Sequence, residues 1–304
     1  MTFPTNPNLN AFLPQFVFVM LTKHMANTLF IGKVYLRFDE LSSTNDYASE
    51  LIASGVSQAG NIYAKSKPAE GTVIRADTQS AGRGQFGSRW ESAAGKNLTF
   101  SVVLYPTWLK ISDQFQLSMA VALALHDAVS SLSPEALPVR IKWPNDLYIG
   151  EHKTAGILIQ NSLSGANIQS SIVGIGLNIN QLEFDPALPN PTSLALAFGQ
   201  HFDLEQIGSL LFECLEQRYL QLKAGRHEAV RSAFEALLFR RGIQSTFRET
   251  ATGQVFAGII LGVTDAGQLR VLTEQGERTF VVREIRTGMR NEENNTFPTN
   301  FEFM

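Results

Sequence analysis

The sequence predicts an α+β fold in which a mixed, mostly antiparallel sheet packs with helices and a small β-barrel follows. First, apolar runs of strand length are mostly joined by short turns, which favours hairpins. Second, long apolar and amphipathic helical patterns are interspersed with these strands. Third, after residue 240 only short strands separated by glycine turns remain, a pattern typical of a small barrel.

The first half of the chain alternates strands with two helices. Strands are predicted over residues 34–38, 72–76 and 98–105. Ser43 or Thr44 is a suitable N-cap for a helix that Gly55 closes. The nearly all-apolar, alanine-rich segment 115–132 predicts a second helix that is buried on most sides.

The second half contains further strands and two amphipathic helices. The strands are expected over residues 139–143, 147–149, 155–160 and 171–178. The helices are expected over residues 203–222 and 226–239. The predicted organisation is a disordered N-terminal extension (1–28), a main domain (29–240), the small barrel (241–288) and a polar tail (289–304).

Composition excludes several classes of function. A net charge of -3 lacks the basic excess of a dedicated nucleic-acid binder, so no nucleic-acid partner is expected. The single cysteine, Cys214, suits a reducing compartment and lies in an apolar helical pattern, which favours a buried structural thiol. The five histidines show no metal-ligand spacing, so no metal site is expected. The apolar segment 11–21 is too short to span a bilayer and lacks a basic start, so we expect a cytoplasmic protein without membrane association.

The most informative segment is the glycine-rich, arginine-bearing loop 82–90, which lies between two predicted strands. Glycines let the backbone approach an anion closely, and Arg83 adds a charge-assisted contact, so a phosphate or carboxylate ligand is expected. The spacing Gly82-x-Gly84-x-x-Gly87 also fits a dinucleotide fingerprint, but that motif opens a helix and this loop runs into a strand. The kinase and Walker motifs are absent as well.

Polar or glycine residues stand at five predicted strand ends, where ligand sites collect. These segments are Ser43-Thr44-Asn45, Gln79 with 82–90, Lys142-Trp143-Pro144-Asn145-Asp146, Lys153-Thr154-Ala155-Gly156 and Gly174-Ile175-Gly176-Leu177-Asn178. In this order they resemble the biotin protein ligases, over roughly residues 34–239. The specificity comes from their joint order, since one glycine loop alone is a weak signal.

The resemblance implies a catalytic domain related to class II aminoacyl-tRNA synthetases and an SH3-like C-terminal barrel. It also implies two reactions: biotin and Mg²⁺-ATP give biotinyl-adenylate and pyrophosphate, and a lysine of a biotin carboxyl carrier protein then takes the biotinyl group. ATP and biotin are therefore expected as substrates, with Mg²⁺ accompanying ATP. About 30 residues precede the catalytic pattern, so we expect a monofunctional ligase without the DNA-binding domain of bifunctional relatives. Monomer and homodimer both remain open.

The resemblance also assigns roles to individual residues. Arg83 and Lys153 are the expected catalytic cations, beside the carboxylate and the phosphate. The residues expected to bind biotin are Ser43, Thr44, Asn45, Gln79, Gly82, Arg83, Gly84, Gln85, Lys153 and Gly156. Those expected to bind ATP or the adenylate are Arg83, Gln85, Trp90, Lys142, Asn145, Asp146, Lys153 and Asn178.

Structural explanations also exist for single residues. On their own, Ser43 or Thr44 fits a helix cap, Lys153 a solvated turn lysine, Trp90 core packing and Asp146 a local cap. Many relatives carry a second arginine two positions after the first, where this chain has Gln85. One cation fewer is expected to weaken the hold on the adenylate.

Two alternative functions remain. A lipoate or octanoate ligase or transferase shares the fold and a lysine such as Lys153, but an Arg-Arg-x-x-Gly-Gly-Gly stretch would be expected and does not occur. A non-catalytic biotin-sensing module is the other, although a pocket for biotin alone needs no phosphate contacts such as Arg83, Lys153 and Asn178 would make.

Overall fold

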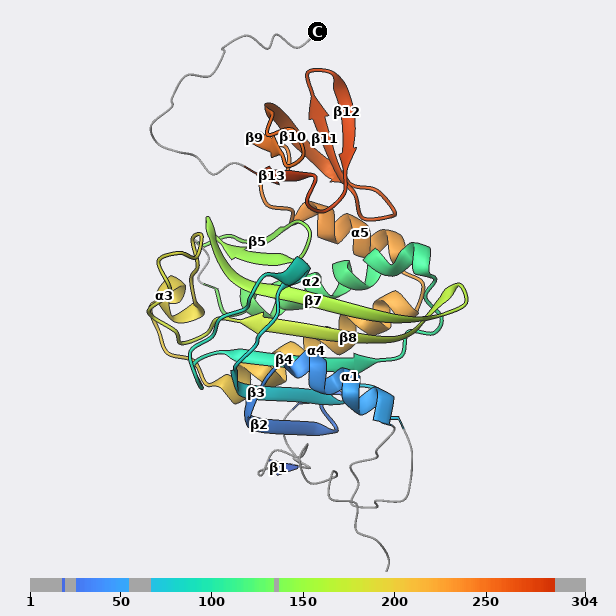
Figure 1. The fold of residues 1–304 in the computed structure, drawn as a ribbon, viewed down its shortest axis with the longest axis vertical. Helices are drawn as coiled ribbons and strands as arrows, with labels where there is room; N and C mark the ends of the chain where they lie inside the picture. Colours follow the sequence, from blue (N-terminus) through green and yellow to red (C-terminus); the bar gives the residue numbers. More distant parts are fainter. Residues whose placement is uncertain (1–17, 20–25, 55–66, 134–136, 288–304) are drawn as a thin grey trace, which may run out of the picture. The chain divides into compact units, whose positions relative to one another are not determined.

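The computed structural model describes residues 18–19, 26–54, 67–133 and 137–287 (Figure 1). The chain divides into two compact units at Phe239/Arg240. The first unit contains an eight-stranded sheet and the second a five-stranded sheet. The site described below lies wholly in the first unit.

The large sheet is mixed and mostly antiparallel, as the sequence predicts. Its strands follow the order β1-β2-β3-β4-β8-β7-β6-β5. Their bounds are β1 Phe18–Val19, β2 Tyr35–Leu41, β3 Val73–Gln79, β4 Leu98–Leu104, β5 Val139–Lys142, β6 Asp146–Ile149, β7 His152–Ser164 and β8 Asn167–Leu177. Among the strands that the structure describes, only β2 and β3 pair in parallel, because α1 (Thr44–Ser54) crosses between them.

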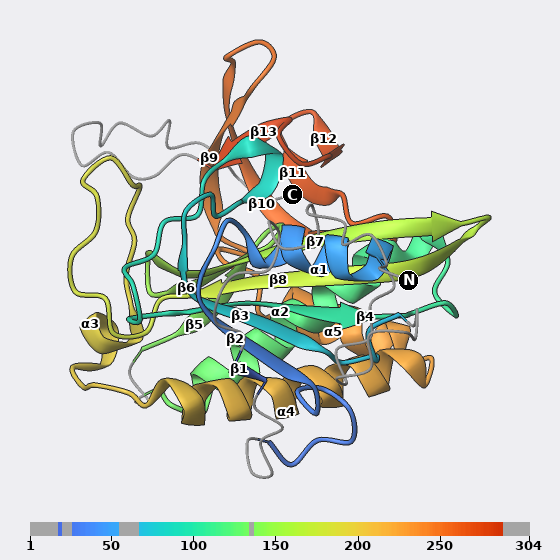
Figure 2. The same ribbon diagram turned by 60° about the horizontal axis from the view of Figure 1, so that its bottom comes forward.

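Helices cover both faces of this sheet (Figures 1 and 2). One face carries α1, and the other carries α2 (Gln114–Ser130), α4 (Leu204–Lys223) and α5 (His227–Ala236). The alanine-rich α2 is buried along most of its length, as predicted, because it packs against β5, β6 and β7 of the sheet and also against α4 and α5. The core is therefore a three-layer packing around the sheet.

Element boundaries differ from the predicted ones by a few residues. The β7–β8 hairpin is longer than expected, and α3 (Leu194–Phe198) and the short 3-10 turns η1 (Gln85–Gly87) and η2 (Ile111–Asp113) are additional. Ser43 directly precedes α1 as the sequence suggests, and Gly55 lies outside the described residues.

The segment just before β2 is held to the rest of the first unit, while the predicted disorder of residues 1–28 stays a prediction. Thr28 is buried, and its hydroxyl donates to the Ile31 carbonyl at 2.6 Å. The buried Glu216 carboxylate accepts the backbone N–H groups of residues 29, 30 and 31. These charge-assisted bonds fix the segment to α4. Other parts of the predicted extension and the polar tail (289–304) lie outside the described residues, apart from β1.

The second unit is an antiparallel sheet in the order β12-β11-β10-β9-β13. Its strands are β9 Gln244–Glu249, β10 Val255–Val263, β11 Leu269–Thr273, β12 Gly276–Phe280 and β13 Ile285–Thr287. Phe247, Val271 and Phe280 are buried in its core. The sheet agrees with the short strands expected after residue 240, and closure into an SH3-like barrel stays a prediction.

Candidate functional site

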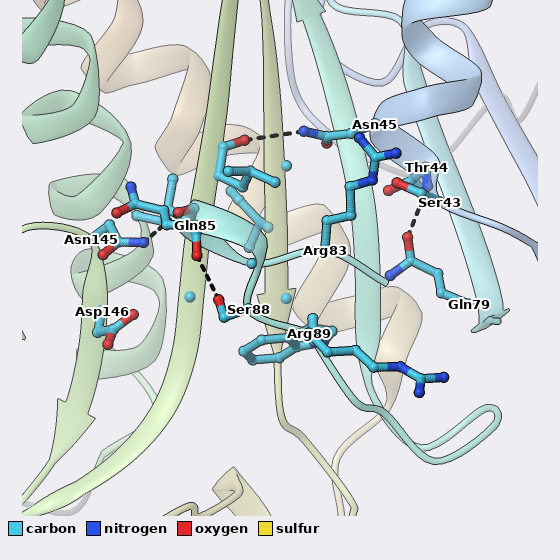
Figure 3. A pocket seen from close by; sticks show the side chains of 18 of the residues that line it. Ser43, Thr44, Asn45, Gln79, Arg83, Gln85, Ser88, Arg89, Asn145 and Asp146 are labelled. Carbon is cyan, nitrogen blue, oxygen red and sulfur yellow. Dashed lines mark hydrogen bonds between the residues drawn. The ribbon is translucent and has the colours of Figure 1, made fainter. Parts of the chain in front are cut away.

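A cavity of about 210 Å³ opens over the sheet of the first unit (Figure 3). Twelve residues that the sequence predicts for the site line it: Ser43, Thr44, Asn45, Gln79, Arg83, Gly84, Gln85, Trp90, Asn145, Asp146, Lys153 and Gly156. In Figure 3, the residues of α1 and β3 lie on one side and Asn145 and Asp146 on the other. Segments far apart in sequence thus meet in one place.

The first side of the cavity is built at the start of α1 and the end of β3. The Thr44 N–H donates to Gln79 Oε1 at 2.8 Å. A backbone N–H can only donate, so this bond fixes the Gln79 amide with its oxygen toward α1. Ser43 and Thr44 are both almost fully buried. The hydroxyl and amide groups here suit a neutral ligand that both donates and accepts hydrogen bonds.

Asn45 is held by strands β4 and β7. Its Oδ1 accepts from the Ser101 hydroxyl at 2.6 Å, and its Nδ2 donates to Gln160 Oε1 at 3.0 Å. Gly174 on β8 makes room for it, because a Cβ at that position would lie 3.0 Å from Asn45 Cγ and closer still to its Oδ1. The glycine is therefore required for close approach of a polar side chain to the sheet.

The glycine-rich loop folds as a small hairpin over the cavity. Gly84 N donates to the Ser88 carbonyl at 2.7 Å, and Trp90 N donates to the Gly82 carbonyl at 3.0 Å. Phe86, in η1, has a φ of 57° and is 55% exposed. A non-glycine residue with φ > 0 carries backbone strain, and such strain often marks a functional loop.

Arg83 extends from this loop to α1. Its guanidinium lies 3.1 Å from Asp46 Oδ1, and its side chain is 56% exposed. A half-exposed ion pair of this kind contributes only about 0.2–1 kcal/mol. The pair can therefore be exchanged for a bound anion at small cost.

Trp90 forms an apolar wall at the end of the loop. The Cβ of an alanine at Gly156 would lie 3.2 Å from its ring, and one at Gly176 would overlap the indole. Glycines on two neighbouring strands therefore provide the space in which the indole lies against the sheet.

Lys153 stands at the start of β7, opposite α1. Its Nζ lies 2.7 Å from Asp146 Oδ1 and 6.0 Å from the Trp90 ring centroid. Its backbone is fixed as well, because Lys153 N donates to the Asn190 carbonyl at 2.9 Å and its own carbonyl accepts from Thr192 N at 2.8 Å. The ammonium is thus positioned by both backbone and side-chain contacts.

Asn145 has a structural contact within the cavity wall. Its Nδ2 donates to the Ile157 carbonyl at 2.6 Å, while the Ile157 N–H donates back to the Asn145 carbonyl at 3.0 Å. The predicted role of Asn145 in nucleotide binding stays a prediction.

Three predicted site residues do not line the cavity. Gly82 supports the loop, since a Cβ there would lie 2.5 Å from the Trp90 carbonyl oxygen. Lys142 Nζ donates to the Tyr148 hydroxyl at 3.1 Å, and burial raises the pKa of that hydroxyl. Asn178 is buried and donates from Nδ2 to the Thr192 carbonyl at 3.0 Å, so it holds the segment that pairs with Lys153.

Further residues complete the lining. They are Ser88, Arg89, Phe100, Ile157, Leu158, Gly174, Ile175 and Gly176. The two glycines and Ile175 belong to a segment that the sequence singles out as a whole. Phe100, Ile157 and Leu158 are apolar strand residues that carry no signal beyond their strand pattern, and they give the cavity an apolar floor.

The described residues offer neither a metal-binding cluster nor a membrane-spanning helix. Among residues 18–19, 26–54, 67–133 and 137–287, no group of three or more His, Cys, Asp or Glu side chains is arranged to hold a metal ion. Within the same ranges, no helix is long and apolar enough to cross a membrane.

Comparison with known proteins places this fold and site in a family. The biotin/lipoate A/B protein ligase family model matches residues 54–178. The chain is 30% identical over 261 residues to the bifunctional ligase/repressor BirA of Bacillus subtilis, covering 85% of this chain and 75% of that protein. It is 32% identical over 219 residues to the biotin–[acetyl-CoA-carboxylase] ligase of Paracoccus denitrificans, covering 71% of this chain and 90% of that protein. The chain belongs to the biotin/lipoate A/B protein ligase family.

Solved structures support the fold. The biotin protein ligase of Aquifex aeolicus in complex with biotin and ATP superposes with a TM-score of 0.66 at 24% identity, covering 84% of this chain and 99% of that chain. The mixed sheet with flanking helices is thus a biotin-ligase-like fold.

Proposed function

We propose that this chain is an ATP-dependent biotin–protein ligase. It converts biotin and ATP into biotinyl-adenylate and then passes the biotinyl group to a lysine of a biotin carboxyl carrier protein. The observation that carries this proposal is the cavity itself, which joins a cluster of hydroxyl and amide groups to two cations, Arg83 and Lys153. A ligand with a neutral hydrogen-bonding ring at one end and a carboxylate at the other fits that distribution.

The parts of biotin correspond to parts of the cavity. The ureido ring, which is neutral and both donates and accepts, suits Thr44, Asn45 and Gln79. The aliphatic chain suits the apolar floor that includes Phe100 and Ile157. The family resemblance supports the same division of roles.

In the first step, a biotin carboxylate oxygen attacks the α-phosphorus of ATP, and the bond from that phosphorus to pyrophosphate breaks. Both reactants are anionic, so the site must hold them together and stabilise the charge that develops. Arg83 and Lys153 supply two positive charges, and each is paired with a protein carboxylate, Asp46 and Asp146 respectively. In this proposal the ligand anions replace Asp46 and Asp146 as partners.

In the second step, the amine of the carrier lysine attacks the acyl carbon, and AMP leaves. The attacking amine must lose a proton. Asp146 is the carboxylate of the cavity lining, and exchange of Lys153 onto the adenylate would free it to accept that proton. Mg²⁺ enters as a substrate ion bound to ATP phosphates, and Asp146 is the acidic side chain available to it.

The polar side of the cavity favours biotin over lipoate or octanoate. A dithiolane ring or an alkyl chain offers no hydrogen bonds to the buried Thr44 and Asn45, and burying polar groups against an apolar ligand is unfavourable. The two cations favour an enzyme over a biotin sensor. We place the reaction in the cytoplasm, which the single cysteine suits.

ATP–pyrophosphate exchange tests the first step. Purified protein is assayed with biotin, lipoate, octanoate or no acid, and the biotin assay is repeated with Lys153→Ala. Exchange should require biotin and fall by about 10²–10³ in the variant, the usual effect of removing one group that stabilises transition-state charge. Lys110→Ala, an exposed lysine outside the cavity lining, is the matched control and should retain the wild-type rate. Exchange that requires lipoate instead of biotin would show that the chain is a lipoate ligase.

A further inference from the structure

A buried chain of hydrogen bonds lies behind the polar side of the cavity. Ser101, at the centre of β4, is fully buried and does not line the cavity. Its Oγ lies 2.7 Å from Thr44 Oγ1 and 2.6 Å from Asn45 Oδ1. Both partners line the cavity, so this serine joins two residues that are proposed to contact the ligand.

The direction of these bonds follows from counting hydrogens. A serine hydroxyl has one hydrogen, and an amide oxygen has none. The Ser101 hydrogen must therefore be donated to Asn45 Oδ1, and the contact with Thr44 requires that the threonine donate to Ser101 Oγ. The Thr44 hydroxyl consequently has only lone pairs left for a ligand.

The orientation of the Asn45 amide is fixed independently. Its other end lies 3.4 Å from the Leu158 carbonyl, which can only accept, and 3.0 Å from Gln160 Oε1. The nitrogen therefore faces β7 and the oxygen faces Ser101. With its N–H groups directed to β7, Asn45 also offers the ligand an acceptor.

We infer that Ser101 is a positioning residue, assisted by Gln160, that sets Thr44 and Asn45 as acceptors for ligand N–H groups. Gln79 supplies the complementary donor, because its oxygen is occupied by Thr44 N and its Nε2 has no hydrogen-bond partner among the described residues. The site thus selects a ring that presents N–H groups to one side and a carbonyl to the other. This inference rests on the proposed function and adds residues that fix its ligand specificity.

The test compares biotin with biotin methylated at a ureido nitrogen, using calorimetry to measure the dissociation constants. Wild-type protein should bind biotin and reject the methylated analogues, because a methyl group replaces the hydrogen that Thr44 or Asn45 accepts. Ser101→Ala should weaken biotin binding by about tenfold, the effect of one lost hydrogen bond. Ser101→Ala should also reduce the ratio between the dissociation constants of methylated biotin and biotin. The Thr44 hydroxyl, no longer held by Ser101, can then rotate and donate a hydrogen bond.

Two matched controls separate positioning from folding. Ser170→Ala also removes a buried strand hydroxyl. That hydroxyl lies 2.9 Å from Ser162 Oγ, and neither serine lines the cavity. This variant should bind both ligands like the wild type. Position 160 is exposed, so it can be varied with little effect on folding. Gln160→Leu removes the acceptor for Asn45 Nδ2 and should weaken biotin binding about two- to threefold, whereas Gln160→Glu keeps an acceptor and should bind biotin like the wild type.

Each outcome has one meaning. If Ser101→Ala and Gln160→Leu both keep wild-type affinity and wild-type discrimination, the positioning role is wrong. The same holds if wild-type protein binds biotin and its methylated analogues equally well. Failure of the wild type to bind biotin at all would instead overturn the proposed function.

Discussion

The close approach of Asn45 to the sheet makes Gly174→Ala a decisive perturbation. The added Cβ would lie 3.0 Å from Asn45 Cγ and 3.2 Å from its Nδ2, and closer still to Oδ1. The backbone has no freedom to withdraw, because Gly174 pairs with Ser101 on β4 and with Leu158 on β7. The Asn45 amide must therefore move and lose its bond to Ser101.

The magnitude follows from two contributions. Overpacking a well-packed site costs about 1–3 kcal/mol. One lost hydrogen bond adds about 1 kcal/mol. Their sum of about 2–4 kcal/mol lowers the unfolding midpoint by on the order of 10 °C, at roughly 2–4 °C per kcal/mol for a unit of this size. Biotin affinity should fall by at least about tenfold, because the displaced amide no longer presents its oxygen.

Scanning calorimetry and titration with biotin measure both effects. The control is Gly208→Ala in α4, where the new Cβ would lie 3.8 Å from Leu98 Cδ1 in ordinary contact. Alanine is the better helix former by about 1 kcal/mol, so this variant should melt at or above the wild-type temperature. A Gly174→Ala protein with wild-type melting and wild-type biotin affinity would refute the packing argument.

Three further predictions concern charge and reactivity. Asp46→Asn removes the partner of Arg83 and should lower the KM for ATP by about two- to fivefold, the range expected for a half-exposed ion pair; a raised KM would contradict the exchange of partners. Gln85→Arg should slow the release of biotinyl-adenylate, and equal off-rates would exclude a role for this position. Burial raises the pKa of the Cys214 thiol to about 11, so alkylation by iodoacetamide at pH 8 should be about a hundredfold slower than for a free thiol near 9, as mass spectrometry can measure.

The sequence predicts the segments of the site better than their mutual contacts. The order of the five polar segments identifies most of the cavity lining, because each segment stands at a strand end and the sheet brings those ends together. The pairing of Arg83 with Asp46 carries no sequence signal, since it depends on how the loop lies over α1. Ser101 carries none either, because one serine in an apolar strand has the same pattern whether or not it supports a site.

Several single residues have both structural and functional explanations at once. Gly174 and Gly176 permit close packing, as a strand glycine commonly does, yet the groups that pack there are Asn45 and Trp90 of the cavity. Lys153 does follow a hairpin turn, but its ammonium is paired with Asp146. Asn178 does not line the cavity and its side chain holds the segment at Thr192, so its predicted role at the nucleotide stays a prediction. Distances between side chains are needed to separate such cases.

The most direct test of the central claim is the complete reaction, followed by intact mass measurement of an acceptor. A biotin carboxyl carrier domain is incubated with this protein, biotin and Mg²⁺-ATP, alongside a carrier in which the acceptor lysine is arginine. We predict that the first carrier gains one biotinyl group, that the arginine carrier gains none, and that Lys153→Ala abolishes the gain. An unmodified carrier in the presence of a protein that binds biotin would contradict the ligase assignment and favour a biotin sensor.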